Sequence, residues 1–116
     1  SRGLGDVYKR QNIGGVDMAV VELTVCPLGT GTTSASSYVA GAQKILSDQD
    51  KVKYLLNPMG TVMEGDIDEI FALIRRIQED VFDKGVGRVY SIIKVDDRRD
   101  KQATMEQKLA SVKAKL

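Results

Sequence analysis

The residue whose type and setting most clearly allow chemistry is Glu64, a carboxylate flanked by apolar residues within a strand-like segment. A carboxylate in such a place either faces solvent or points into a binding site. If it is partly buried, it can accept hydrogen bonds from an amine and offset positive charge on a ligand, and Glu22 could act in the same way. The alternative is that either glutamate pairs across strands with Lys94 or Arg88, which contributes under ~1 kcal/mol when the pair is exposed.

Neutral polar and aromatic residues could complete such a site. Hydroxyl groups donate and accept hydrogen bonds, and an aromatic face stacks on a flat heterocycle or on a cation. Each type also has an ordinary structural role in strands, loops, helix caps or the core, and for Ser34 capping is the stronger alternative. The candidate ligand-binding residues are Glu64, Thr61, Glu22, Thr24, Thr30, Ser34, Tyr90 and Lys94.

Several kinds of catalytic and metal site are excluded by residue type. The chain has no histidine and one cysteine, so one copy cannot form a Ser-His-Asp triad, a Cys-His pair or a zinc site with the usual ligands. The glycine-rich loop 29–34 lacks the lysine of a Walker phosphate loop. Arg88 and Asn57 match the arginine and asparagine of ferredoxin-like acylphosphatases by residue type alone. We therefore expect a protein that is not an enzyme and that needs no cofactor or metal.

Composition limits the partners and the compartment. Seventeen basic and sixteen acidic residues give a net charge of +1, and the chain has no tryptophan, two phenylalanines and four tyrosines for base stacking. We therefore expect no nucleic-acid partner. A single cysteine fits a reducing compartment, and no apolar run reaches membrane-spanning length. The expected location is the cytoplasm, with no membrane partner.

Alternating hydrophobicity predicts the strands that must position these residues. In the clearest case Ala19, Val21 and Leu23 share one face, whereas Val20 and Glu22 lie on the other. A proline and a glycine in the segment 57–60 favour a chain reversal between two of the strands. Strands are expected at residues 19–26, 52–56, 61–65 and 88–95.

Helix signals separate these strands. A serine at position 34, 36 or 37 is expected to cap a helix through its side-chain oxygen. Asp66 is expected to cap a second helix, whose apolar residues recur at helical spacing and which ends at the glycines of the segment 84–87. A terminal helix with a narrow apolar seam is expected to dock on its own domain rather than form a coiled coil. The seam consists of Met105, Leu109, Val112 and Leu116.

The order of the elements predicts an α+β fold of the ferredoxin-like βαββαβ type, with an antiparallel sheet, two helices on one face and an added C-terminal helix. Residues 18–116 are expected to form this single domain, and residues 1–17, which show no period, a disordered or non-native leader. The face away from the helices, called here the second sheet face, mixes apolar and polar groups. Such a face favours an oligomer interface, a ligand floor or both. The second sheet face is expected to carry Val20, Glu22, Thr24, Cys26, Tyr90, Ile92 and Lys94.

Three segments carry a resemblance to a known family. They are MAVVELTVCPLGT at residues 18–30, YLLNPMGTVMEG at residues 54–65 and GRVYSIIKVDDR at residues 87–98. Through these segments the chain resembles the thiamine-binding protein family of small ferredoxin-like proteins. The resemblance extends over almost everything except the leader, and it implies the same fold as the order of the elements does.

The resemblance also implies a non-enzymatic protein that forms homodimers or homotetramers through its sheet and binds thiamine or hydroxymethylpyrimidine near a subunit contact. The matched positions lie around Thr61 and Glu64, together with the loop 27–30. Thiamine has a cationic thiazolium and an aminopyrimidine whose amine donates hydrogen bonds, so a carboxylate suits it. Such a protein would act as a carrier, sensor or buffer. The alternative is a regulatory or structural oligomeric module with no small-molecule ligand.

Overall fold

The computed structural model of this protein describes residues 18–100 and 104–116, so the leader expected at residues 1–17 lies outside the described residues. Within the described ranges the elements follow the expected order of strand, helix, strand, strand, helix, strand and helix. The elements are β1 (Met18–Leu28), α2 (Ser36–Ser47), β2 (Lys53–Asn57), β3 (Gly60–Asp66), α3 (Ile67–Asp83), β4 (Arg88–Asp97) and α4 (Met105–Ala114).

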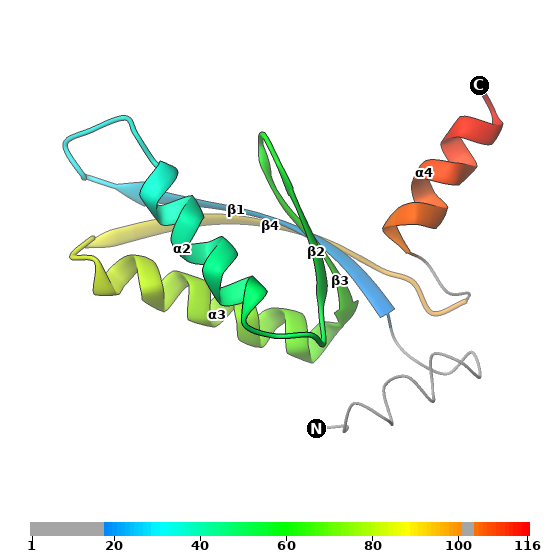
Figure 1. Cartoon of the computed structure of the whole chain (residues 1–116), viewed down its shortest axis with the longest axis horizontal. Helices are drawn as coiled ribbons and strands as arrows, with labels where there is room; N and C mark the ends of the chain where they lie inside the picture. The colour runs from blue at the N-terminus through cyan, green and yellow to red at the C-terminus, as the bar shows by residue number, and fades with distance from the viewer. Residues whose placement is uncertain (1–17, 101–103) are drawn as a thin grey trace.

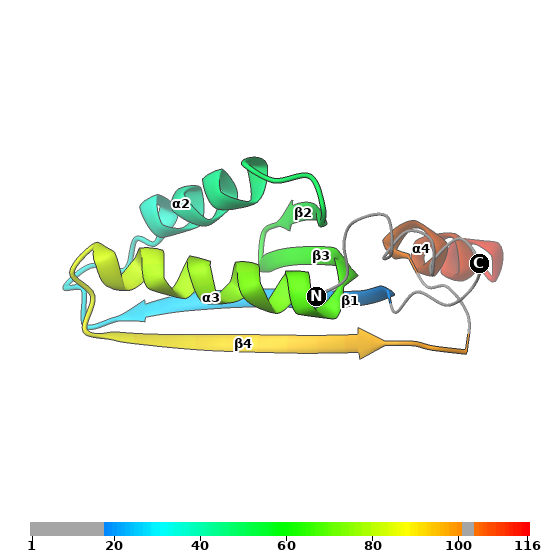
Figure 2. The ribbon, with the colours of Figure 1, turned by 90° about the horizontal axis from the view of Figure 1, so that it is seen from below.

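The strands form one antiparallel sheet in the order β2-β3-β1-β4. β1 is a central strand that pairs with β3 on one side and with β4 on the other, whereas β2 and β4 are the edges (Figure 1). Figure 2 shows α2 and α3 on the same side of the sheet. This arrangement is the predicted α+β ferredoxin-like fold, with α4 added after the last strand.

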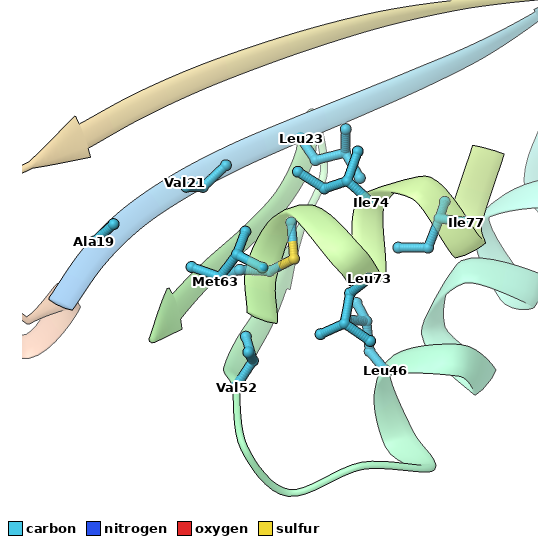
Figure 3. Close-up of a cluster of buried hydrophobic side chains, with 10 residues drawn as sticks. Ala19, Val21, Leu23, Leu46, Val52, Met63, Leu73, Ile74 and Ile77 are labelled. Carbon is cyan, nitrogen blue, oxygen red and sulfur yellow. The ribbon is translucent and has the colours of Figure 1, made fainter. Parts of the chain in front are cut away.

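The core lies between the sheet and the helix layer, and the alternation of β1 builds its floor. Ala19, Val21 and Leu23 point toward the helices and are 0%, 0% and 4% exposed. Figure 3 shows them facing Met63 of β3 and Ile74 of α3. Full burial of a valine, leucine, isoleucine or methionine side chain stabilises a fold by about 1.5–3 kcal/mol, and burial of the alanine methyl group by less. The buried cluster is Ala19, Val21, Leu23, Leu46, Val52, Met63, Ile70, Leu73, Ile74 and Ile77.

The start and end of α3 follow the sequence signals closely. Asp66 is its N-cap, and the Oδ2 atom accepts a hydrogen bond of 3.3 Å from the backbone N–H of Glu69. The apolar stripe faces the sheet, so Ile70 and Val81 are buried. The helix ends at the C-cap Lys84, and the following glycine has a φ of 92°, a conformation that glycine adopts without strain.

The start of α2 differs from the prediction of a serine cap. Ala35 occupies the N-cap position and makes no side-chain cap hydrogen bond, so Ser34 lies one residue too early to act as the cap. The backbone carbonyl of Ala35 instead accepts hydrogen bonds of 3.1 Å from the N–H groups of Tyr38 and Val39. The Ser34 N–H donates to Oγ1 of Thr32 at 3.2 Å. The polar residues of this loop therefore hydrogen-bond one another rather than the helix.

The terminal helix α4 forms as predicted, but most of its apolar seam does not pack on its own domain. Thr104 and Gln107 form a capping box at its start. Leu109 and Val112 are each 58% exposed, and Leu116 is 99% exposed. The helix stands apart from the layer of α2 and α3 (Figures 1 and 2). Within the described single chain the seam is therefore covered only at Met105, which is half-buried, and the prediction that it packs on its own domain is wrong for Leu109, Val112 and Leu116.

Candidate functional site

A pocket of about 310 Å³ lies on the helix side of the sheet, between the first half of α2, the end of β1 and the β2–β3 turn. Its walls are mostly apolar, and they contain no charged residue. Small-molecule sites usually have volumes of ~300–1,000 Å³ with apolar walls and a few placed polar groups. The pocket is lined by Leu23, Thr24, Val25, Cys26, Ala35, Tyr38, Val39, Ala42, Gln43, Leu56, Asn57, Pro58, Met59, Gly60, Thr61 and Val81.

One wall of the pocket is a single face of α2. Residues Ala35, Tyr38, Val39, Ala42 and Gln43 all line the pocket. They recur at spacings of three, one, three and one, which places them along one side of a helix. Because the same helix also buries an apolar residue in the core one turn further on, the pocket is continuous with the core layer at its inner end.

The opposite wall is the β2–β3 turn, which lies close against β1. A Cβ atom on Gly60 would be 2.9 Å from the backbone oxygen of Leu23 and 2.9 Å from Oγ1 of Thr24. The hydroxyl of Thr24 donates a hydrogen bond of 2.9 Å to the backbone oxygen of Met59 and so ties the turn to β1. Glycine at position 60 therefore permits the close approach that shapes this end of the pocket.

One side-chain hydrogen bond crosses the pocket region from helix to sheet. The Nε2 atom of Gln43 donates to Oγ1 of Thr61 at 3.0 Å, although the two residues are 18 apart in sequence. Thr61 is only 7% exposed, and it lies on the helix side of β3 opposite Leu23. The pocket therefore combines mostly apolar walls with the carboxamides of Gln43 and Asn57 and three hydroxyl groups, a set that suits a small, uncharged, flat ligand.

The candidate residues from the sequence do not form one site. Thr61 and Thr24 line the pocket, whereas Thr30 and Ser34 lie in the loop before α2 and are not among its lining residues. The hydroxyl of Thr30 donates to the backbone oxygen of Thr32 at 3.0 Å. The remaining candidates are Glu64, Glu22, Tyr90 and Lys94, none of which lines the pocket.

Glu64 lies on the second sheet face, beneath the start of α4. It is 2% exposed, and its Oε2 atom is buried with no hydrogen-bond partner among the described residues. Burial raises the pKa of the Glu64 carboxyl above its ordinary value, while the neighbouring Lys53 and the backbone N–H of Met105, which hydrogen-bonds the carboxylate, partly counter the rise. The negative charge of Glu106 adds to it. Glu64 is thus a buried carboxyl group with one oxygen atom left to accept a hydrogen bond, but it lies on the face opposite the pocket.

The other second-face candidates form a cross-strand pair and an exposed surface. Glu22 lies opposite Lys94 in the register of β1 and β4, and Lys94 Nζ is 3.6 Å from Glu22 Oε1. This is the pairing weighed above as the alternative for Glu22. Tyr90 and Ile92 on the same face are 55% and 44% exposed. The second sheet face therefore presents apolar area to its surroundings at β4.

The sequence reasoning missed Gln43, which the structure places beside Thr61. A signal was present, since this glutamine falls on the apolar stripe of the helix, four residues after Val39, where a core-facing helix usually carries an apolar residue. Met63 of β3 is fully buried in the core. Met59 lines the pocket and is 82% exposed.

Two absences apply to the described residues. Across residues 18–100 and 104–116, no group of three or more histidine, cysteine, aspartate or glutamate side chains could hold a metal ion. Over the same stretches, no helix has the length and apolar character needed to cross a membrane.

The part of the chain that matches a known protein family includes both walls of the pocket. A family model described as thiamine-binding protein matches residues 21–113. The UPF0045 protein YqgV of Bacillus subtilis is 47% identical over 102 residues, which are 85% of this chain and 98% of that protein. The crystal structure of protein MJ1052 from Methanocaldococcus jannaschii has a TM-score of 0.74 at 40% identity, covering 82% of this chain and 95% of that one.

A more distant solved structure shares the fold. It is a Thermotoga maritima protein described as a candidate for thiamine biosynthesis or salvage. Its TM-score is 0.69 at 19% identity, and the match covers 82% of this chain and 98% of that chain. At this identity the likeness supports the ferredoxin-like arrangement of the strands and helices.

Proposed function

This chain belongs to the thiamine-binding protein family, and we propose that it binds thiamine, hydroxymethylpyrimidine or a related small heterocycle, without catalysis, in the pocket between α2 and the β2–β3 turn. The observation that carries the proposal is the pocket itself, about 310 Å³ in volume, with apolar walls and a Gln43–Thr61 hydrogen bond beside them. A flat ring fits between apolar walls, and an amide and a hydroxyl can fix its orientation.

The chemistry of the lining residues supports binding rather than catalysis. Among the described residues, none that lines the pocket is a carboxylate, lysine, arginine or histidine. General acid–base catalysis most often uses a histidine, a carboxylate or a lysine within reach of the substrate, whereas the titratable groups of the described lining are Tyr38 and Cys26. Cys26 is the one thiol of the lining, and a thiol without a neighbouring cation or base is a poor nucleophile.

The proposed setting is a cytoplasmic homodimer or homotetramer that uses the second sheet face and the β4 edge. Tyr90 and Ile92 of β4 and Leu55 of β2, all on that face, are 55%, 44% and 52% exposed. Exposed apolar edge strands are normally covered in the assembled protein, because they otherwise invite uncontrolled pairing. The cytoplasmic location rests on the single cysteine of the chain.

The ligand role of Glu64 stays a prediction. A ligand in the pocket lies on the helix side of the sheet, whereas Glu64 pairs with Val20 in the register that faces the other side. Within one copy the pocket and this carboxylate are therefore separated by the sheet. The unpartnered Oε2 atom nevertheless keeps Glu64 a candidate acceptor for a ligand or for a group of a partner subunit.

The proposal is tested by isothermal titration calorimetry of thiamine and of hydroxymethylpyrimidine into the full chain. Val39→Phe would place a ring in the pocket that Val39 lines, and Ala40→Phe adds the same ring at a neighbouring exposed position of α2 outside the lining. We expect saturable micromolar binding that Val39→Phe abolishes and Ala40→Phe preserves. Equal binding by both variants would show that the ligand lies elsewhere. In the same titrations Glu64→Gln tests the carboxylate, since weaker binding would implicate it.

A second candidate function is an oligomeric interaction module with no small-molecule ligand. The exposed apolar residues of the second sheet face favour it, because they offer a partner area that the pocket does not explain. Light scattering distinguishes the two. An oligomer that gives no heat with either compound would support the module, whereas a monomer that binds a ligand would contradict it.

A further inference from the structure

We infer that Gln43 is the specificity-determining residue of the pocket, and that its carboxamide, oriented by Thr61, recognises an amino group next to a ring nitrogen on an uncharged heterocycle. This inference rests on the function proposed above and goes beyond it, because it states which half of a thiamine-like molecule the pocket binds. It also assigns that recognition to a residue on α2 rather than to a carboxylate.

The first support is the unused hydrogen-bonding capacity of Gln43. Its Nε2 atom donates to Thr61 Oγ1 at 3.0 Å, and no other hydrogen bond joins the Gln43 side chain to the described residues. A carboxamide has two N–H donors and an oxygen acceptor. One N–H is engaged, so a second N–H and the oxygen remain for a ligand at a site that the same side chain lines.

The second support is the match between these groups and an aminopyrimidine. An amino group beside a ring nitrogen presents a donor and an acceptor side by side in one plane. A carboxamide presents the complementary acceptor and donor, which is how asparagine and glutamine form paired hydrogen bonds with adenine. The Thr61 hydroxyl limits rotation of the Gln43 amide, because it occupies one N–H from a position that is itself 7% exposed on β3.

The third support is the uncharged lining of the pocket. In the part of the chain that the structure describes, no lining residue is acidic or basic. A cationic thiazolium would lose hydration there without gaining a counter-charge, and a phosphate ester would find no cation. The pocket therefore suits the neutral aminopyrimidine half of such a ligand, and leaves a charged half outside.

A purely structural role for Gln43 predicts a different effect on ligand binding. If the 3.0 Å hydrogen bond to Thr61 only fastens α2 to the sheet, its loss would weaken the binding of every ligand to the same extent. If Gln43 hydrogen-bonds to the amino group, its loss would weaken the binding of only those ligands that carry an amino group. The two readings separate when protein and ligand are altered together.

The test is calorimetric titration of hydroxymethylpyrimidine and of its desamino analogue, in which hydrogen replaces the amino group. Wild-type protein is expected to bind the amino compound about ten- to hundredfold more tightly, because the desamino compound leaves the amide oxygen unpaired. Gln43→Met keeps the length of the side chain and removes both hydrogen-bonding groups. It should bind the two compounds with nearly equal affinity.

Two further variants keep the test decisive. Lys44→Met alters the adjacent exposed residue of α2 and should retain the full preference of the wild-type protein. Thr61→Val removes the orienting hydroxyl with little change of shape, so it should reduce the preference several-fold even if Gln43→Met fails to fold. A preference that survives in both Gln43→Met and Thr61→Val would overturn the inference.

The outcome also separates this inference from the proposed function. Tight binding of both compounds by the wild-type protein, with no preference, would leave the pocket as a ligand site and refute the role of Gln43. Failure of the wild-type protein to bind either compound would refute the proposed function and the assignment together.

Discussion

Replacement of Gly60 by alanine tests how the pocket is built, since this glycine sits where the β2–β3 turn meets β1. A Cβ atom there would be 2.9 Å from the backbone oxygen of Leu23 and 2.9 Å from Oγ1 of Thr24. Real Cβ atoms essentially never come so close, so either the strand or the turn must move. Leu23 belongs to the central strand, which is paired on both sides, and its oxygen cannot retreat without disturbing the sheet.

The expected cost follows from these contacts. Forcing an extra methyl group into a packed site usually costs ~1–3 kcal/mol. The move also strains the 2.9 Å hydrogen bond from Thr24 to the backbone oxygen of Met59. Alanine restricts the unfolded chain more than glycine does, and this effect offsets ~0.4–1 kcal/mol of the loss in stability. We therefore expect Gly60→Ala to lower the free energy of unfolding by about 1–2 kcal/mol, and the melting temperature by roughly 4–10 °C.

Gly41→Ala is the matched control, because its methyl group would also be crowded, but by different atoms. The Cβ atom at Gly41 would meet the ends of the Asp80 and Lys84 side chains. These atoms form a partly exposed ion pair between α3 and its C-cap residue, and they can rotate aside. Gly41 lies within α2, where alanine favours the helix by about 0.5–1 kcal/mol. This variant should be as stable as the wild-type protein, or more stable.

Thermal unfolding followed by circular dichroism, with urea denaturation as a second measure, decides between these expectations. Gly60→Ala should also weaken binding of hydroxymethylpyrimidine, since the displaced turn is a wall of the pocket. A Gly60→Ala protein as stable as the wild type, or less damaged than Gly41→Ala, would show that the nearness of the turn to β1 does not constrain this position.

The remaining predictions concern the core and the second sheet face. Ile70→Ala removes a side chain that is 0% exposed and should lower the free energy of unfolding by about 2–5 kcal/mol in urea denaturation, where a loss under ~1 kcal/mol would contradict tight packing. Glu22→Gln breaks the pair in which Lys94 is 76% exposed, so it should change stability by under ~1 kcal/mol, and by less still at ~1 M salt. Burial raises the pKa of Glu64 in the folded state, so its contribution to stability is full below the ordinary value of 4.5 and is lost as pH rises through the raised pKa. Glu64→Gln should therefore raise the melting temperature near pH 7 more than near pH 4, and a larger gain at the lower pH would refute the buried-charge account.

The two faces of the sheet have separate consequences. The helix face holds the core and the pocket, so changes there should affect stability and ligand binding. The second sheet face holds the buried Glu64 and the exposed Tyr90 and Ile92. The contribution that we propose for it is assembly, and a charge placed at Ile92 would test this proposal.

Much of the fold could be predicted from local signals. The alternation of β1, the Asp66 cap of α3 and the glycine after Lys84 each depend on residues a few positions apart, and the structure confirms all of them. The prediction of a serine cap for α2 was wrong, because Ala35 takes the N-cap position, one residue after Ser34. The prediction that the α4 seam packs on its own domain failed beyond Met105, because residue spacing shows that a helix is amphipathic but not what covers its apolar side.

The candidate site was less predictable, and part of the reason lies in strand geometry. Thr61 and Glu64 were matched as one site, yet they are three residues apart on one strand. Successive side chains on a strand point to opposite faces, so an odd spacing separates them. The register confirms this, since Thr61 pairs with Leu23 on the core side and Glu64 with Val20 on the other. The sequence already held that information.

The sequence by itself determined the elements, their order and the absence of histidine chemistry, because each depends on residue type and on short-range periodicity. Only the tertiary structure decided where a ligand could sit. Gln43 reaches Thr61 at 3.0 Å because α2 packs across β3, and Gly60 lets the turn approach β1. These contacts join segments that are distant in the chain, and they form only when the burial of the shared core brings helix and sheet together.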